Sequence, residues 1–247
     1  MSHRTSPNLR GAPPAACLVL AALACQTISG GTHAPVPTPT QKPRLTGTAT
    51  PRPTETSPVR GTELLSDDFA SERWGTGTDQ DSAIEYAEGA LQFVVFTKSW
   101  FAWSTPNEET YQDVHIEVTA INNDTDASTA FGIMCNQQSP ENSYHYFAVT
   151  PSGEYAIARA TADQTDVFLT NDDEWAASDL IARNAASYRL GADCGNGALT
   201  LYVDRQRVDS VSDTTYASGG VALFVWSGRE ATNTNVAFDD FVMTALP

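Results

Sequence analysis

The chain has 247 residues and a formal net charge of −16, and its charge divides sharply near residue 60. Residues 1–60 hold six Lys/Arg and one acidic residue, whereas residues 61–247 hold eight Lys/Arg and 29 Asp/Glu. An acidic field of this size repels phosphate backbones and anionic lipids, which argues against nucleic acid as a partner and against membrane attachment through basic patches. Neutral sugars and divalent cations stay compatible partners, and the acidity also serves simply to keep a protein soluble.

Residues 1–24 are expected to form an export signal. Two arginines precede an apolar run over residues 15–24, which has the length of a signal-peptide core and is too short to span a bilayer. The run ends in the sequence ALAC at 22–25, which resembles the bacterial lipobox except that Ala replaces the usual Leu at its first position. The resemblance implies a lipid on Cys25 and an exported, membrane-anchored lipoprotein facing the extracellular side or the periplasm. The alternative is cleavage near Ala24 and release of a free protein.

Residues 25–60 are expected to be a disordered linker. Between residues 34 and 60, 14 of 27 residues are Thr or Pro, a composition that cannot build a core. Fixed proline φ angles favour extended polyproline II at about 3.1 Å per residue, so the segment would reach roughly 80 Å. The linker would therefore hold the following domain clear of the membrane.

Residues 61–247 are expected to form one all-β domain. Short runs rich in β-branched and aromatic residues alternate with turn residues, and no long stretch has a helical period. The expected strands cover residues 91–96, 114–118, 130–134, 144–149, 154–158, 187–190, 198–203, 207–211, 220–225 and 236–242. So many strands without helices between them predict an antiparallel two-sheet β-sandwich. Within it, 150–153 should be a hairpin turn, and Leu199, Leu201 and Val203 should face the core.

Several of these segments resemble a known family. Asp67-Asp68-Phe69 ahead of Trp74, the strand–turn–strand 144–158, the segments 199–204 and 219–224, and the closing 238–241 resemble, in that order, concanavalin A-like jelly rolls. They are most similar to 3-keto-disaccharide hydrolase-like domains of bacterial surface lipoproteins. The resemblance covers residues 62–245 and rests on structural motifs, so it implies a jelly-roll fold.

One hairpin departs from the family pattern. Asp204-Arg205 stands where the resembling domains carry Asn-Gly. Because Arg lacks the access to positive φ that Gly has, we expect a different or looser turn there.

The cysteines indicate a disulfide. With Cys25 lipidated, the mature chain keeps only Cys135 and Cys194, and both lie in expected strands. In an oxidising compartment two such residues on neighbouring strands would form a bridge, while the alternative is two small buried thiols. No Cys/His spacing for zinc is present.

The sequence holds no pattern that identifies an enzyme. Glucanases of the laminarinase type, which share the jelly-roll fold, use a Glu-x-Asp-x-x-Glu strand, and this chain lacks it. No nucleophilic serine elbow, metalloprotease helix or phosphate loop occurs either. We therefore expect a protein without catalytic residues, although acids from loops would allow glycoside chemistry.

Two sets of residues are candidate binding groups. Sugar sites use aromatic rings to stack on pyranose faces, and the candidates are Trp100, Trp103, Tyr144, Tyr146, Trp175 and Trp226. Core packing is the competing role for each of them. The other candidate ligand is a structural calcium ion; we expect that the protein requires no cofactor. The ion would bind Asp67, Asp68, Asp239 and Asp240 if the terminal strands pair, and otherwise these are ordinary strand-end acids.

The sequence thus favours a cell-surface lipoprotein, monomeric, whose non-catalytic module binds carbohydrate or another cell-envelope component. The first alternative is a glycoside-active hydrolase of the 3-keto-disaccharide hydrolase or glucanase type. The second is a structural envelope module that recognises protein. Fold resemblance alone does not decide among them, because one fold hosts many functions.

Overall fold

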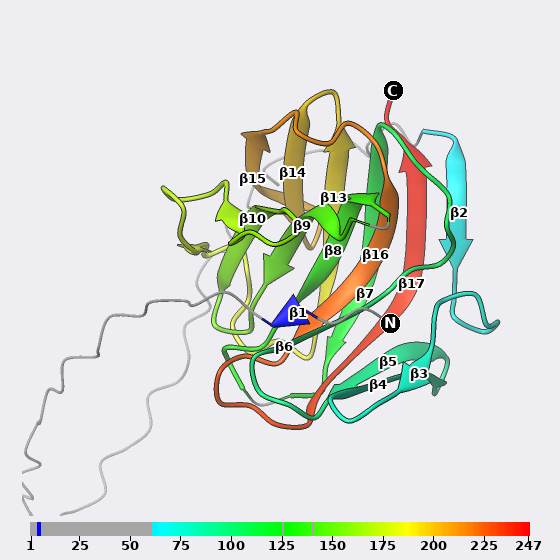
Figure 1. The fold of residues 1–247 in the computed structure, drawn as a ribbon, viewed down its shortest axis with the longest axis vertical. Helices are drawn as coiled ribbons and strands as arrows, with labels where there is room; N and C mark the ends of the chain where they lie inside the picture. Colours follow the sequence, from blue (N-terminus) through cyan, green and yellow to red (C-terminus); the bar gives the residue numbers. More distant parts are fainter. Residues whose placement is uncertain (1–3, 6–60, 125, 140) are drawn as a thin grey trace, which may run out of the picture. The chain divides into compact units, whose positions relative to one another are not determined.

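The computed structural model describes residues 4–5, 61–124, 126–139 and 141–247, and it shows two antiparallel sheets packed face to face (Figure 1). The expected all-β sandwich is therefore confirmed. Cys25, most of the expected export signal and the expected linker lie outside the described residues. Within the described part, no helix is long and apolar enough to cross a membrane.

The first sheet, called sheet A, has the strand order β1-β6-β16-β8-β9-β10-β11, and β12 also pairs with β10. Its strands are β1 (Arg4–Thr5), β6 (Trp100–Ser104), β8 (Ala130–Gln138), β9 (Ser143–Val149), β10 (Glu154–Ala160), β11 (Val167–Phe168), β12 (Ala176–Ala177) and β16 (Gly220–Trp226). Since β1 lies within the segment expected to be removed on export, β6 would form this edge of the sheet in the exported chain.

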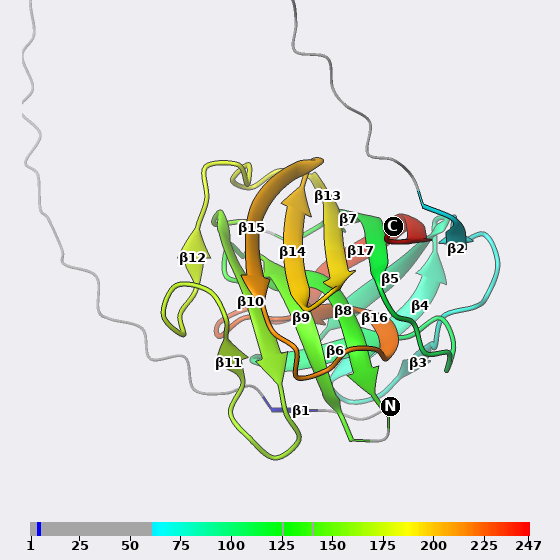
Figure 2. The same ribbon diagram turned by 90° about the horizontal axis from the view of Figure 1, so that it is seen from above.

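The second sheet, called sheet B, has the order β15-β14-β13-β7-β17-β5-β4-β3, and β2 pairs with the C-terminal half of β17. Its strands are β2 (Glu63–Asp67), β3 (Gly77–Thr78), β4 (Ser82–Ala87), β5 (Ala90–Val95), β7 (Val114–Asn122), β13 (Ser187–Gly195), β14 (Ala198–Val203), β15 (Gln206–Ser212) and β17 (Thr234–Ala245). Figure 2 shows β13, β14 and β15 lying across β8, β9 and β10.

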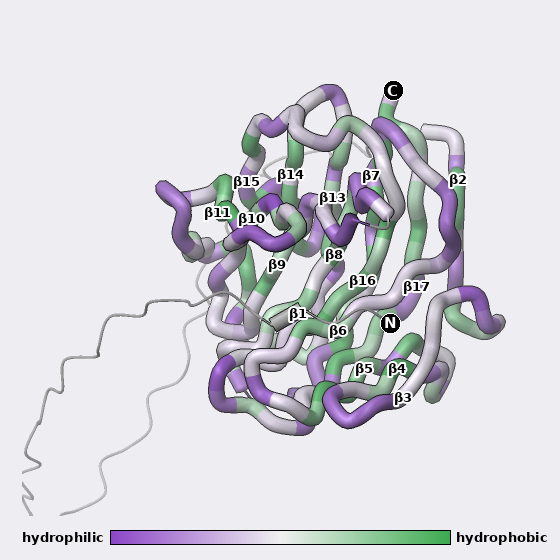
Figure 3. Tube along the Cα trace, in the orientation of Figure 1, coloured by the Kyte–Doolittle hydropathy of each residue, from purple (hydrophilic) through white to green (hydrophobic). Residues whose placement is uncertain are grey.

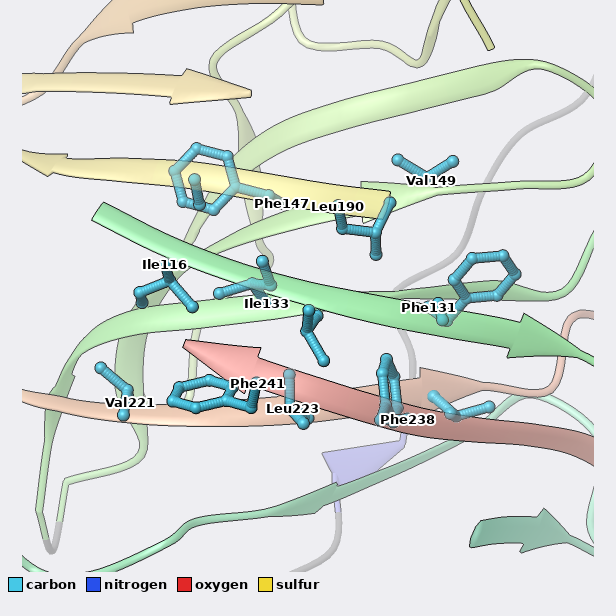
Figure 4. Close-up of a cluster of buried hydrophobic side chains, with 14 of the residues drawn as sticks. Ile116, Phe131, Ile133, Phe147, Val149, Leu190, Val221, Leu223, Phe238 and Phe241 are labelled. Carbon is cyan, nitrogen blue, oxygen red and sulfur yellow. The ribbon is translucent and has the colours of Figure 1, made fainter. Parts of the chain in front are cut away.

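The core fills the space between the sheets. Alternate residues of each strand point into it, as the period of two requires, and Figure 3 shows apolar residues concentrated on the strands. Figure 4 shows the centre of this core, built from Ile116, Phe131, Ile133, Phe147, Val149, Leu190, Val221, Leu223, Phe238 and Phe241. Leu199, Leu201 and Val203 also face it, at 1% exposure or less, as predicted.

Cys135 and Cys194 form the expected disulfide, but it joins the two sheets rather than neighbouring strands of one sheet. Cys135 lies on β8 of sheet A and Cys194 on β13 of sheet B, and their Cα atoms are 6.5 Å apart. Both residues point into the core, where the facing sheets bring their Cβ atoms together. The bridge is therefore a covalent tie across the sandwich.

The turn at Asp204 and Arg205 is tight, so the expectation of a looser turn is wrong. Val203 of β14 pairs with Gln206 of β15, which leaves a two-residue loop. Both loop residues have positive φ, 50° and 64°, as in type I′ turns. Asp204 fixes the loop, because its backbone N–H donates to the Arg189 carbonyl at 2.8 Å and its carboxylate accepts from the Arg189 N–H at 3.0 Å. Strand pairing and these bonds outweigh a positive-φ cost of roughly 1–2 kcal/mol at Arg205.

The predicted hairpin turn at 150–153 is confirmed. Gly153 has φ 91°, a conformation that suits glycine, and its N–H donates to the Thr150 carbonyl at 3.1 Å. The turn joins β9 to β10, so it fixes the register in which Tyr146 lies opposite Ala158.

Candidate functional site

The outward face of sheet A is aromatic, although one polar face per sheet is the usual pattern in a sandwich. Inward positions of its strands hold core residues such as Ile133, Phe147 and Leu223, so the alternate positions point away from sheet B. Six of these outward side chains are aromatic, and we call them the aromatic face: Phe101, Trp103, Tyr144, Tyr146, Phe224 and Trp226.

The rings of the aromatic face contact one another. Phe101 stacks on Phe224 with ring centroids 4.8 Å apart and planes 15° apart. Its ring also lies 6.4 Å from those of Tyr144 and Tyr146 and 6.2 Å from that of Trp103. Residues from three strands, β6, β9 and β16, thus converge on one cluster, centred on Phe101.

Exposure differs across this cluster. Phe101 and Trp103 on β6 are half-buried, whereas Tyr144, Tyr146 and Phe224 are buried, at 3%, 6% and 1% exposure. The two β6 side chains are therefore the ones that present ring surface to solvent. The buried rings hold them in place.

Small residues and a second aromatic pair continue the same face toward β11. Gly132, Ala148, Ala156 and Ala158 occupy outward positions on β8, β9 and β10. Beyond them, Phe168 lies opposite Ala158 and packs against Trp175, with ring centroids 5.9 Å apart. The face thus has aromatic rings at both sides and alanine between them.

Polar groups on this face are few. The Tyr146 hydroxyl donates to the Asp166 carboxylate at 3.3 Å. The Trp226 indole nitrogen is buried and finds no hydrogen-bond acceptor within the described part of the chain. A buried N–H without a partner costs roughly 1–3 kcal/mol, and this one has no surface that a ligand could contact.

The structure brings four of the six predicted aromatic residues together: Trp103, Tyr144, Tyr146 and Trp226. Trp100 points the other way, because it lies an odd number of residues from Trp103, and it packs against the core. Trp175 lies in the loop before β12, beside Phe168.

Sequence reasoning missed Phe101 and Phe224. Each is two residues from a predicted candidate on the same strand, Phe101 from Trp103 and Phe224 from Trp226. A period-two search starting at the tryptophans would have found both. The expected strands also did not include β6, which carries Phe101.

The terminal strands pair as expected, since Phe241 of β17 lies opposite Asp67 of β2. The Asp67 carboxylate already accepts from the Trp74 indole at 3.2 Å and the Phe69 N–H at 2.8 Å. Asp240 pairs with Arg189 at 3.0 Å. Asp68 and Asp239 accept from backbone N–H groups of the residues that follow them.

The described residues hold no cluster of three or more His, Cys, Asp or Glu side chains suited to a metal ion. A calcium ion at Asp67, Asp68, Asp239 and Asp240 stays a prediction, and it would have to compete with the hydrogen bonds that these side chains make.

The outward face of sheet B carries a charged network, and the ring of Tyr202 lies beside it. His115 Nδ1 lies 2.6 Å from Asp193, and Nε2 lies 3.5 Å from Glu117. Burial alone would lower the pKa of His115, but the hydrogen bonds to these two carboxylates raise it to about 9. The His115 hydrogen bond in turn lowers the pKa of Glu117 to about 2, helped by Arg189 at 3.1 Å. The charged groups of this network pair with one another, so we assign the network to the stability of the fold.

No protein-family model matches the sequence, and no curated protein matches it either. Solved structures do share its fold. Carbohydrate-binding module CBM66 from Bacillus subtilis aligns at a TM-score of 0.55 and 13% identity, covering 70% of this chain and 96% of that one. A Bacillus subtilis protein of unknown function with a galectin-like fold aligns at 0.56 and 9% identity, covering 75% and 96%. Bacillus licheniformis β-glucanase aligns at 0.53 and 12% identity, covering 76% and 99%.

These alignments, at such low identities, show the fold alone. The domain is a concanavalin A-like jelly-roll sandwich, as the sequence motifs implied.

Proposed function

We propose that this domain is a non-catalytic carbohydrate-binding module, and that the aromatic face of sheet A binds the glycan. The observation that carries the proposal is the gathering of six aromatic side chains on one outward sheet face, with Phe101 and Trp103 partly open to solvent. Its structural neighbours include a carbohydrate-binding module and a β-glucanase, which fits this class of ligand.

The chemistry of the face suits a sugar. Aromatic rings stack on the apolar C–H surface of a pyranose, and a few placed polar groups then orient it. On this face the Tyr146 hydroxyl and the Asp166 carboxylate lie beside the rings.

Two of the acids near this face are spaced too widely for glycoside hydrolysis. Glycoside hydrolysis generally needs two carboxyl groups about 5–9.5 Å apart. Asp173 also lies near this face, because its carboxylate accepts the Phe168 N–H at 2.7 Å. The widely spaced pair is Glu154, at the start of β10, and Asp166, which lies level with Ala160 at its end. Six residues at about 3.3 Å per residue separate these two levels by about 20 Å. This pair is too far apart to act on one bond.

The proposed setting is the outside of the cell, with the module anchored through a lipid on Cys25 and raised by the Thr/Pro-rich linker. A disulfide between Cys135 and Cys194 is compatible with an oxidising compartment. Metabolic labelling with a palmitate analogue tests the anchor. We expect wild-type chain to be labelled and the Cys25→Ala variant not to be. Equal labelling of both would overturn it.

Binding to immobilised glycans tests the module. Trp103→Ala should weaken binding at least tenfold, because it removes one of the two half-buried stacking rings while the buried rings stay packed. Tyr202→Ala is the matched control, since it removes a half-buried aromatic ring from the outward face of sheet B. Thermal melting checks that both variants fold. The proposal is refuted if the wild type binds no glycan on a broad array, or if both variants bind equally well.

A further inference from the structure

A polar pocket lies at one end of the sandwich, away from the six aromatic residues, and we call it the end pocket. Its walls are the β13–β14 turn with the residues after it (195–199) and the loop after β15 (213–217, without Thr215), completed by Gln112, Asp113 and Asn136. Its volume is about 140 Å³. Because a water molecule occupies about 30 Å³ in the liquid, the pocket has room for about five waters or a single small polar molecule.

One wall is fixed by a buried histidine. His145 is fully buried on the inward side of β9, with Asn136 Nδ2 3.1 Å from its Nδ1 and Asp213 Oδ1 3.3 Å from its Nε2. This arrangement matches the neutral tautomer with its proton on Nε2, and burial lowers the pKa of His145 accordingly. Asn136 and Asp213 both line the pocket, so His145 holds two lining side chains from behind.

Asp213 is fixed further by two other groups. Its carboxylate pairs with Arg159 of β10 and accepts the Thr215 N–H at 2.8 Å. Its side chain is only 6% exposed. The acceptors of this wall are therefore held in place before any ligand arrives, which is the usual property of a binding site rather than of a surface depression.

The opposite wall is packed closely around two glycines. A Cβ at Gly195 would lie 2.6 Å from Asp113 Oδ1, and a Cβ at Gly197 would lie 2.9 Å from Thr214 Cγ2. Gly197 also has φ 70°, which favours glycine. Asp113 is held in turn, because it accepts the Asn196 N–H at 2.7 Å.

The lining chemistry selects the ligand class. Two carboxylates, three side-chain amides, hydroxyls and the Tyr216 ring face one small space, and none of the residues that line it is Lys or Arg. Carboxylates accept hydrogen bonds from hydroxyl groups, and amides both donate and accept. An anion would be repelled by the carboxylates, and the neutral amides carry no charge to balance it. We infer that the end pocket is a second binding site, which takes one neutral polyhydroxyl group such as a single sugar ring. The site does not require the aromatic face to bind glycan.

Protein NMR on the full chain tests this inference. D-glucose, D-galactose and D-fructose are titrated separately at millimolar concentrations, while the backbone amides of 195–197 and 213–217 report on the pocket. At least one of the three sugars should shift these signals in a saturable way, and glucuronate should not. The Trp103 indole signal reports on the aromatic face in the same spectra, so failure of one site is distinguished from failure of the other.

A blocking variant completes the test. Ala217→Trp places a large ring at an exposed position of the pocket rim and should abolish the pocket shifts. Ala70→Trp, the same change at an exposed position outside the pocket, should leave them unchanged. The inference is overturned if none of the three sugars moves the pocket signals, if Ala217→Trp retains the shifts, or if calcium alone produces them, which would indicate a cation site.

Discussion

Removing the disulfide should cost this domain a large share of its stability. The double variant Cys135→Ala/Cys194→Ala deletes the covalent tie between β8 and β13. The bridge closes a loop with a sequence separation of 59 residues. In the chain-entropy treatment a loop of this length contributes about 4 kcal/mol, mostly by restricting the unfolded chain.

The same magnitude can be expressed as a melting temperature. The unfolding entropy of a domain spanning residues 61–247 is roughly 0.4 kcal/mol/K, from about 2.1 cal/mol/K per residue. A loss of about 4 kcal/mol therefore lowers Tm by roughly 10 °C.

Denaturant unfolding of the wild type, the double variant and chemically reduced wild type measures the effect. Reduced wild type is the control for side-chain loss, because its thiols keep almost the same core volume as the bridge. We expect both perturbed forms to unfold at clearly lower denaturant. The reasoning fails if reduced wild type is as stable as the oxidised protein, or if only the alanine variant is destabilised, since packing would then account for the loss.

Three further outcomes follow from individual residues. Arg205→Gly should raise stability by about 0.5–1 kcal/mol, because Gly tolerates positive φ, and a lower Tm would contradict it. His115 has a folded pKa of about 9 against 6.5, so its contribution of at most roughly 3 kcal/mol is complete below pH 6.5 and disappears as pH rises through 9. A His115→Gln variant should lose that slope in unfolding measurements between pH 6 and 10. Burial lowers the pKa of His145, so the slope of stability against pH has the opposite sign: its contribution is complete above pH 6.5 and is lost as pH falls below that value. NMR titration of its ring above pH 6.5 would contradict this.

Local sequence patterns determined most of the strands of this domain. Alternation of apolar and polar residues predicted β14 at 198–203 with its observed bounds, and it identified Leu199, Leu201 and Val203 as inward. Gly153 and the residues before it predicted the β9–β10 turn. These features depend on period and on φ preferences, which neighbours in the chain decide.

The disulfide could be predicted because only Cys135 and Cys194 were left to pair once the other cysteines were assigned elsewhere. That it would join the two sheets could not be predicted. That Cys135 and Cys194 lie on facing sheets depends on how strands 59 residues apart are stacked. The turn at Arg205 shows the same limit. Its residue preference pointed to a looser loop, and pairing along β14 and β15 overrode it.

The candidate site was decided by the tertiary structure. β8, β9 and β16 carry apolar or aromatic residues on both faces, so their sequences show which residues share a face but not which face turns toward sheet B. Only the packing of the two sheets sent Tyr144, Tyr146 and Phe224 outward and Trp100 inward. The period of two decides which side chains share a face of a strand. Long-range strand pairing, which no local pattern encodes, decides which of the two faces points into the core.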